Sequence, residues 1–199
     1  MTSVRLFVRA IPSYLKKLVP KSLRLRAAVR AMHRLSDRSY MEKTILSFFG
    51  GRCPARVLFV GTEIYTAHYS RWFAGSEYWT MDVRPEAACH GAKGRHVTAS
   101  VLAADDHFER GYFDVVILNG VFGWGVDSIE DQNTTLRAVR RILKPAGILV
   151  LGWNNDRMPE PLELRELKNG FTHGIGGGLP NRKTFPDTSH VYDFFCVKS

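Results

Sequence analysis

The chain has 199 residues, of which 45% are hydrophobic and 24% are charged. These values are typical of a globular protein that buries a core, and the length suits one domain with an appendage. The three cysteines, Cys53, Cys89 and Cys196, are too far apart to form a zinc or redox motif, so we expect free thiols and no metal site. The sequence holds no run of about 18 apolar residues, and we expect no membrane-spanning helix.

The net charge of +9 at pH 7 is concentrated in the N-terminal part of the chain. Residues 1–45 contain 11 of the 28 Lys and Arg residues but only two acids, Asp37 and Glu42. The other 17 basic and 17 acidic residues balance one another in residues 46–199. We therefore predict a basic helical N-terminal extension over 1–45 and an α/β domain over 46–199. A neutral body lacks the basic surface that nucleic-acid binding needs, so nucleic acid is not expected as a partner.

The basic extension has the apolar spacing of helices. Apolar residues recur at helical intervals between Val4 and Leu18, Pro20 ends that pattern, and a second helix is predicted over roughly residues 22–35. Three interpretations fit: a structural cap on the body, an amphipathic segment in residues 1–35 that lies on an anionic membrane surface, and an Arg-rich transit peptide. The first two predict a cytoplasmic protein, membrane-associated under the second, and the third predicts an organelle.

The body alternates strand-like and helix-like segments. Predicted strands cover residues 56–60, 78–81, 95–101, 114–119 and 148–153, and predicted helices cover 40–49, 66–73 and 129–143. Further along, residues 181–185 and 188–198 are predicted to form a hairpin-like pair of strands. Strands that alternate with helices indicate a parallel sheet, in which the ligand binds beyond the carboxyl ends of the strands.

Residues suited to a nucleotide-bearing cofactor follow several of these strands. Gly61 ends the first strand and allows a ligand to approach the backbone closely, and the amino end of the helix at 66–73 would favour a negative group there. Asp82 lies at the tip of the second strand, where an acid commonly accepts hydrogen bonds from ribose hydroxyls. After the fourth strand, the glycine-rich aromatic loop 119–127 suits the wall of a ligand site.

The order of these motifs resembles a known enzyme family. The segments VLFVG, MDV, FDVVILNGVFGW and LRAVRRILKPAGILVLG are similar to class I S-adenosylmethionine-dependent methyltransferases, and closest to the type 11 group. The most specific part is RILKPAGILVLGW, and the resemblance covers roughly residues 54–155. It implies a doubly wound, mostly parallel seven-stranded sheet of the Rossmann-like methyltransferase kind, whose last strand is antiparallel. It also implies S-adenosylmethionine as the cofactor.

The resemblance implies cofactor contacts residue by residue. They are Gly61, Thr62, Glu63 and Tyr65 at the methionine part, Asp82 and Val83 at the ribose, Ser100 and Val101 beside the adenine, and Asn119, Gly120, Val121 and Trp124 near the sulfonium. The chain departs from the family pattern at four places. Phe59 replaces an acid, the first turn keeps a single glycine, and Ser100 stands where an acid usually binds the adenine. A histidine often found after the fourth strand is replaced near Trp124. Glu63 is predicted to contact the ammonium group of the cofactor in place of the missing acid.

The sequence gives less information about the residues that would bind the methyl acceptor. His173, His190 and Tyr192 are candidates for a general base, although each taken singly has an ordinary structural explanation. In-line positioning of two reactants supplies much of the rate of a methyl transfer, so the reaction does not require a base.

We therefore predict an S-adenosylmethionine-dependent methyltransferase that acts on a small-molecule, sugar or lipid-linked acceptor. The alternative is a degenerate methyltransferase-fold protein that binds a partner without catalysis, which the altered glycine turn favours. A nicotinamide-dependent oxidoreductase is disfavoured because no G-x-G-x-x-G motif follows the first strand.

Overall fold

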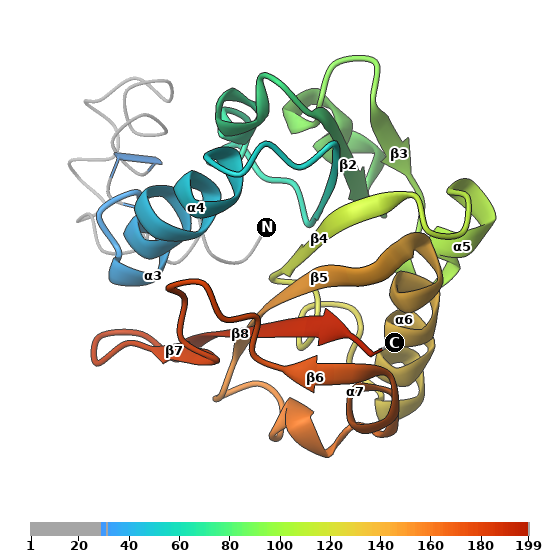
Figure 1. The fold of residues 1–199 in the computed structure, drawn as a ribbon. Coiled ribbons are helices and arrows are strands. Elements are labelled where there is room, and N and C mark those ends of the chain that lie inside the picture. Colours follow the sequence, from blue (N-terminus) through green and yellow to red (C-terminus); the bar gives the residue numbers. More distant parts are fainter. Residues whose placement is uncertain (1–28, 31, 199) are drawn as a thin grey trace.

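An eight-stranded sheet forms the centre of the protein, and helices cover it (Figure 1). The structure is a computed structural model that describes residues 29–30 and 32–198. The strands are β1 (Arg56–Val60), β2 (Glu77–Asp82), β3 (His96–Thr98), β4 (Phe113–Asn119), β5 (Leu143–Asn154), β6 (Phe171–His173), β7 (Arg182–Thr184) and β8 (His190–Val197).

The strand order confirms the predicted doubly wound sheet. Neighbouring strands follow the order β3-β2-β1-β4-β5-β8-β6, and β7 also pairs with β8. The pairs among β1 to β5 are all parallel, whereas β8 is antiparallel to β5, β6 and β7. The predicted count of seven strands is wrong by one, because the sequence analysis predicts no strand at Phe171–His173, which form β6. β8 is longer than β6, so part of its outer edge is free for the short strand β7, which pairs there.

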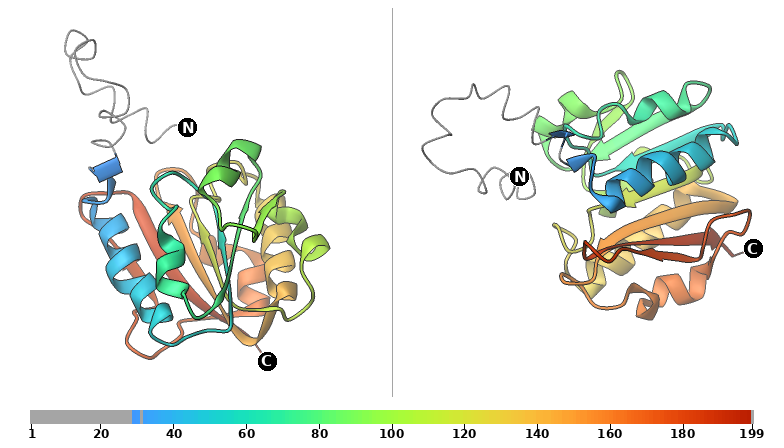
Figure 2. Two further views of the ribbon diagram at one scale, coloured as in Figure 1. Left: turned by 90° about the horizontal axis from the view of Figure 1, so that it is seen from above. Right: turned by 90° about the vertical axis from the view of Figure 1, so that its left-hand side faces the viewer.

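Two separate apolar layers cover the two faces of the sheet. Leu58 and Val60 of β1 lie in the layer that contains α6, whereas Val57 and Phe59 lie in the layer that contains helical residues 41–49. Figure 2 shows helices on both sides of the sheet. Successive side chains of a strand point to opposite faces, so a strand covered on both sides is apolar throughout. This burial explains the nearly continuous apolar runs of the sequence.

The first helical run joins the basic extension to the body. It consists of α3 (Ser36–Tyr40), a π-helical part (Met41–Leu46) and α4 (Ser47–Gly50), which follow one another without a break. This run crosses the predicted boundary between residues 45 and 46. The other α-helices are α5 (Ala104–His107), α6 (Ile129–Ile142) and α7 (Arg165–Gly170), and short 3-10 turns cover Tyr69–Phe73, Pro85–His90, Val101–Ala103 and Pro161–Glu163.

The segment after β1 does not form the predicted helix. Residues 66–73 contain turns followed by the single 3-10 turn Tyr69–Phe73, so the expected helix amino end facing the ligand is wrong. The Thr66 side chain accepts from the Glu63 backbone N–H and donates to the Glu63 carbonyl, both at 2.9 Å. Such local side-chain bonds to the backbone compete with helix formation.

The predictions for the extension fall mostly outside the described residues. The helix predicted between Val4 and Leu18 lies wholly outside them, and only residues 29–30 and 32–35 of the second predicted helix are described. In the described part of the chain, no helix is long and apolar enough to cross a membrane.

A buried carboxylate fixes the closing strand of the sheet. Asp193 of β8 is fully buried, and its two oxygens accept four hydrogen bonds. Arg182 donates from Nε at 2.7 Å and from Nη2 at 2.9 Å, Trp153 donates from Nε1 at 2.8 Å, and His173 Nε2 lies at 2.9 Å. One acid therefore connects β5, β6, β7 and β8.

Replacement of Asp193 should destabilise the protein strongly. We expect Asp193→Ala to lower the free energy of unfolding by about 3 kcal/mol or more, because it leaves a partly buried guanidinium and two ring nitrogens without their shared acceptor. Urea unfolding followed by circular dichroism measures the change. The exposed Asp106→Ala is the matched control and should stay within about 0.5 kcal/mol of the wild type. Equal stability of the two variants would contradict this account of β8.

Candidate active site

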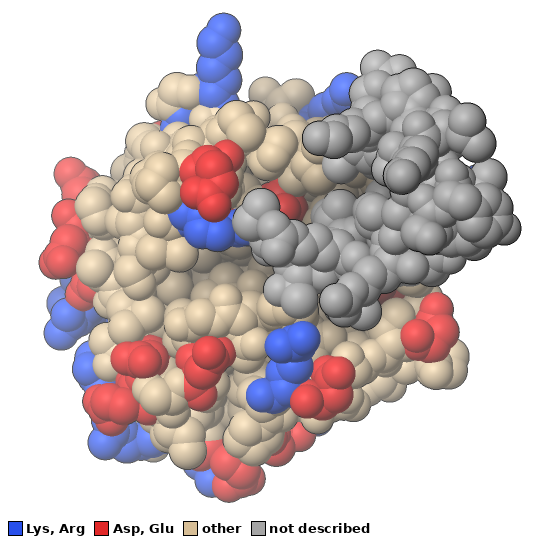
Figure 3. Space-filling model, turned by 180° about the vertical axis from the view of Figure 1, so that it is seen from behind, with Lys and Arg blue, Asp and Glu red and all other residues tan. Residues whose placement is uncertain are grey.

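A cavity of about 450 Å³ lies at the carboxyl ends of the parallel strands. Residues at the ends of β1, β2, β4 and β5, at the start of β8 and in the segment 32–38 line it. Figure 3 shows the molecule from behind, where the surface is hollowed beside the residues drawn in grey. The volume is that of an ordinary small-ligand site, and the position is the one at which doubly wound sheets bind ligands.

The cavity brings together nearly all residues predicted to contact a cofactor. Those that line it are Gly61, Glu63, Tyr65, Asp82, Val83, Ser100, Val101, Asn119, Gly120, Val121 and Trp124. Thr62 is the exception, because it is buried and its backbone N–H donates to Asp82 Oδ2 at 2.9 Å. Thr62 therefore orients the acid and does not face the cavity.

Asp82 lies at the tip of β2 as predicted, but its carboxylate is already paired. Arg84 donates to it from Nε and Nη2, each at 3.0 Å, and from the backbone N–H at 2.9 Å. Burial raises the pKa of Asp82, but the hydrogen bonds from Arg84 and Thr62 outweigh burial and hold the pKa below its usual value. The carboxylate is therefore ionised at neutral pH and neutralised by a guanidinium that the sequence analysis did not include.

The same guanidinium joins the loops that follow β1 and β2. Arg84 Nη1 donates to Glu63 Oε1 at 2.8 Å, and Nη2 donates to the Thr62 carbonyl at 2.8 Å. Glu63, which was predicted to contact an ammonium group, thus has a cationic partner within the protein. The sequence signal for this network was the spacing of Arg84, two residues after Asp82, which lets its side chain fold back onto the acid.

Gly61 is required by the close approach of two strand ends. Its φ of +94° is one that side chains rarely allow, and a Cβ atom there would lie 2.4 Å from the carbonyl oxygen of Asn119. Its N–H donates to the Met81 carbonyl at 3.0 Å. The single glycine of the turn therefore stands where the ends of β1, β2 and β4 meet.

Arg38 is a cavity residue that the sequence analysis missed. It comes from α3, its side chain is only 11% exposed, and its guanidinium lies over the Tyr65 ring with the central carbon 4.5 Å from the ring centre. Its nearest acid is Asp37, with Nε and Oδ2 3.5 Å apart. Within the described part of the chain, its Nε and Nη1 donate no hydrogen bond. The sequence placed Arg38 in a generic basic run, and no local signal separated it from its neighbours.

Comparison with known proteins identifies the central segment. Residues 60–151 match a family model described as a methyltransferase domain. This segment is a methyltransferase domain of the class I, S-adenosylmethionine-dependent kind. It is thus an enzyme of methyl transfer, with S-adenosylmethionine as its cofactor. No curated protein matches the sequence significantly.

Solved structures show the same fold at low sequence identity. The N-methyltransferase NodS from Bradyrhizobium japonicum WM9 is 14% identical, with a TM-score of 0.61 over 82% of this chain and 96% of that one. A TehB-like SAM-dependent methyltransferase from Corynebacterium glutamicum is 16% identical, with a TM-score of 0.58 over 87% and 100%. The 1,6-didemethyltoxoflavin-N1-methyltransferase of Burkholderia thailandensis, 15% identical, gives 0.55 over 88% of each chain.

His190 is the one general-base candidate that lines the cavity of this methyltransferase. Its Nδ1 lies 3.3 Å from Asn154 Oδ1, and its Nε2 lies 3.2 Å from Asn119 Oδ1. Trp124 donates to the same Asn154 oxygen at 3.2 Å, and a neutral imidazole donates from only one of its two nitrogens. Burial, and then the charge of Arg38, lower the pKa of His190 to about 3.

The other two candidates lie away from the cavity. His173 faces the buried carboxylate of Asp193, and Tyr192 is fully buried with its hydroxyl donating to the Asp37 carbonyl at 3.3 Å. Both side chains are held by structural contacts, so the structure gives neither of them a place at the reacting groups. His190 and Tyr192 are two residues apart and share one face of β8, with ring centroids 4.6 Å apart, but only His190, at the start of the strand, lines the cavity.

The buried His190 predicts a specific acid instability. Its folded pKa of about 3 lies below the ordinary value of 6.5, so between these values the unfolded chain binds more protons at this position. Stability therefore falls as the pH drops through this window, at up to about 1.4 kcal/mol per pH unit. We expect His190→Gln to reduce that slope relative to the wild type in urea titrations at pH 4 to 6.5. The exposed His107→Gln is the control, and an unchanged slope in His190→Gln would contradict the prediction.

Proposed function

We propose that this methyltransferase transfers the cofactor's methyl group to an oxygen or nitrogen atom of a small-molecule acceptor that binds in the same cavity. One observation carries the proposal: residues predicted for the methionine, ribose, adenine and sulfonium parts line a single cavity at the strand ends. The basic charge of residues 1–45 supports an acceptor that is anionic or lipid-linked, or one that lies at an anionic membrane surface.

The residues of the cavity fit the polar parts of S-adenosylmethionine. Asp82 provides an ionised carboxylate for the ribose hydroxyls, and Ser100 and Val101 lie beside it for the adenine. The Ser100 hydroxyl accepts from the Leu102 N–H at 3.3 Å and so caps the following turn. The fit requires one rearrangement, because Arg84 occupies the Asp82 oxygens that the ribose would use.

Arg38 adds a positive charge that suits a carboxylate to the cavity residues that fit the cofactor. Its Nε and Nη1 have no hydrogen-bond acceptor among the residues that the structure describes. A buried guanidinium of this kind gains more from an anion than a solvated one, since charge-assisted bonds are strong and unmade ones are costly. It stands over Tyr65, in the loop that follows Gly61, and so beside the part of the cavity predicted for methionine. We therefore assign Arg38 to the α-carboxylate of the cofactor.

In this proposal, the methyl acceptor binds beside polar side chains at the end of β5 and the start of β8. Asn154, Thr188 and His190 line the cavity there, together with Trp124. His190 is neutral at working pH because of its lowered pKa, so it can orient an acceptor through hydrogen bonds without carrying charge. When bound, S-adenosylmethionine supplies an electrophilic methyl group, and the contribution of the protein is to hold the acceptor in line with it and exclude water.

A pair of ligands tests the assignments of Asp82 and Arg38. S-adenosylhomocysteine carries the ribose and the amino-acid carboxylate, whereas 5′-methylthioadenosine carries only the ribose. We expect Asp82→Ala to weaken both ligands by roughly 10- to 100-fold, because both lose bonds to a charged acceptor. We expect Arg38→Met to weaken S-adenosylhomocysteine by roughly tenfold or more and to leave 5′-methylthioadenosine unchanged. Isothermal titration calorimetry measures both affinities.

The two ligands also provide the controls. Retained binding of 5′-methylthioadenosine shows that Arg38→Met is folded, and the exposed Asp106→Ala should bind both ligands like the wild type. Loss of both ligands from a folded Arg38→Met would refute its assignment to the carboxylate. Failure of the wild type to bind either ligand would refute the cofactor site and favour the non-catalytic alternative.

Arg84 should compete with the cofactor for Asp82. Because the ribose must displace a guanidinium from the carboxylate, Arg84→Met should bind S-adenosylhomocysteine several-fold, up to about tenfold, more tightly than the wild type. The effect is kept modest because the Arg84 side chain is 32% exposed and water screens the ion pair. Calorimetry with Arg110→Met, which removes an exposed arginine, is the matched comparison. Weaker binding by Arg84→Met would show that Arg84 supports the ligand and does not compete with it.

A further inference from the structure

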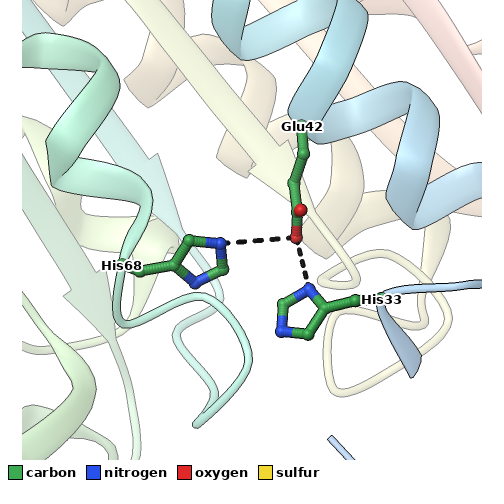
Figure 4. Close-up of side chains that lie close together, drawn as sticks. All are labelled: His33, Glu42 and His68. Carbon is green, nitrogen blue, oxygen red and sulfur yellow. Dashed lines mark hydrogen bonds and ion pairs between the residues drawn. The ribbon is translucent and has the colours of Figure 1, made fainter. Parts of the chain in front are cut away.

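Two histidines and a glutamate from three segments meet at the edge of the molecule beside the cavity (Figure 4). His33 lies just before α3, Glu42 lies in the helical run that follows, and His68 lies in the loop after β1. One carboxylate oxygen, Glu42 Oε1, is 2.6 Å from His33 Nδ1 and 3.5 Å from His68 Nε2. The three potential ligand atoms all lie within 4.8 Å of one another, and the described residues contain no other such group of three.

The donor set and the spacing suit a metal ion of the zinc class. Two imidazole nitrogens and one carboxylate oxygen are the protein ligands of many zinc sites that keep a fourth position open. Ligand atoms at about 2.1 Å from a tetrahedral ion are roughly 3.4 Å apart. The separation of His68 Nε2 and Glu42 Oε1 already has that value, and His33 Nδ1 is about 0.8 Å closer to Glu42 Oε1 than that value.

The three side chains are accessible but not fully solvated. His33 and His68 are each 27% exposed, and Glu42 is 16% exposed. His68 also packs against the rings of Tyr69 and Trp72, which limits its orientations. An ion can therefore reach the cluster from solvent, while the ligands have less freedom to lose on binding than surface side chains have.

Each member of the cluster is a close chain neighbour of a cavity residue. His33 lies between Met32 and Leu35, Glu42 is one helical turn beyond Arg38, and His68 is three residues beyond Tyr65, and all four of these neighbours line the cavity. A bond between the three segments would hold the N-terminal wall of the cavity against the loop that follows β1.

We propose that His33, Glu42 and His68 bind one divalent transition-metal ion, best matched by zinc, which fastens the segment carrying Met32 and Leu35 to the wall of the cavity. The site differs from the sequence expectation of no metal, because its ligands are 9 and 26 residues apart in the chain and form no recognised spacing. The expected effect of the ion on cofactor affinity rests on the proposed function, whereas binding of the ion does not.

Metal binding is tested on the full chain without any cofactor. Zinc titrated against a chromogenic chelator should bind at one ion per chain, and cobalt(II) should give visible d–d absorption without the charge-transfer band of a thiolate ligand. Glu42→Gln and His68→Ala should each weaken zinc by at least about 100-fold, more than the loss of a typical outer-sphere partner. The exposed His107→Ala should bind zinc like the wild type.

Several results would overturn the site. These are no saturable zinc or cobalt binding by the wild type, a thiolate band that assigns the ion to the cysteines, or unchanged affinity in folded Glu42→Gln and His68→Ala. The proposed attachment of the N-terminal segment to the cavity wall is tested by a separate measurement. Zinc should raise the affinity of the wild type for S-adenosylhomocysteine several-fold, and it should not change the affinity of His68→Ala for the same ligand. If zinc binds to the wild type without altering its affinity for S-adenosylhomocysteine, the attachment role is refuted. If the wild type does not bind S-adenosylhomocysteine at all, the proposed function is refuted and the metal site is not.

Discussion

Burial of both faces of the central sheet is the constraint on which the other features depend. Val57 and Phe59 of β1 enter one apolar layer and Leu58 and Val60 enter the other, so the strand has no room for a polar side chain. A buried polar group within the sheet needs partners of its own, as Asp193 of β8 has. The carboxyl ends of the parallel strands share one edge, and Asp82 is brought into the cavity for that reason.

The same constraint explains how the chain departs from the usual glycine turn. Phe59, which stands where the family has an acid, is fully buried in the layer formed with the first helical run, so it packs the core and does not reach the cavity. Charge near the turn comes instead from Glu63 and from Arg84, which pairs with it. Relative to the family pattern, the chain therefore lacks the acid at position 59 of β1. It has instead an ion pair, Glu63 with Arg84, in the loops that follow β1 and β2.

Charges in the cavity are compensated in two different ways. Asp82 is held ionised by Arg84 through several hydrogen bonds, which stabilise its charge in a largely buried position. Arg38 has no comparable partner among the described residues and instead lies against an aromatic ring and near Asp37. The pairing of Asp82 with Arg84 stabilises the protein without a ligand. Arg38, in contrast, keeps N–H groups that can donate to a ligand. A cavity with both is suited to a ligand that carries hydroxyls at one end and a carboxylate at the other.

The described part of the N-terminal extension, from residue 32 onward, belongs to this arrangement. Met32, Leu35 and Arg38 line the cavity, and the helical run 36–50 covers one face of the sheet. For the described residues, the extension therefore packs on the body, as the structural-cap interpretation requires. This contact also makes the cluster of His33 and its partners a link between the extension and the loop after β1.

The sequence by itself determined all the strands except β6, and the strand tips at which Gly61 and Asp82 lie, because period, turn residues and helix signals are local properties of the chain. It could not determine which of several basic residues reaches the cavity, since Arg38 and Arg84 differ from their neighbours only in what the folded chain places opposite them. His190 and Tyr192 show the same limit, because they share one face of β8 and only the segments packed against that face leave the first at the cavity and the second in the core. Tertiary structure decided these matters, since ion pairs, burial and pKa values depend on segments that meet only after folding.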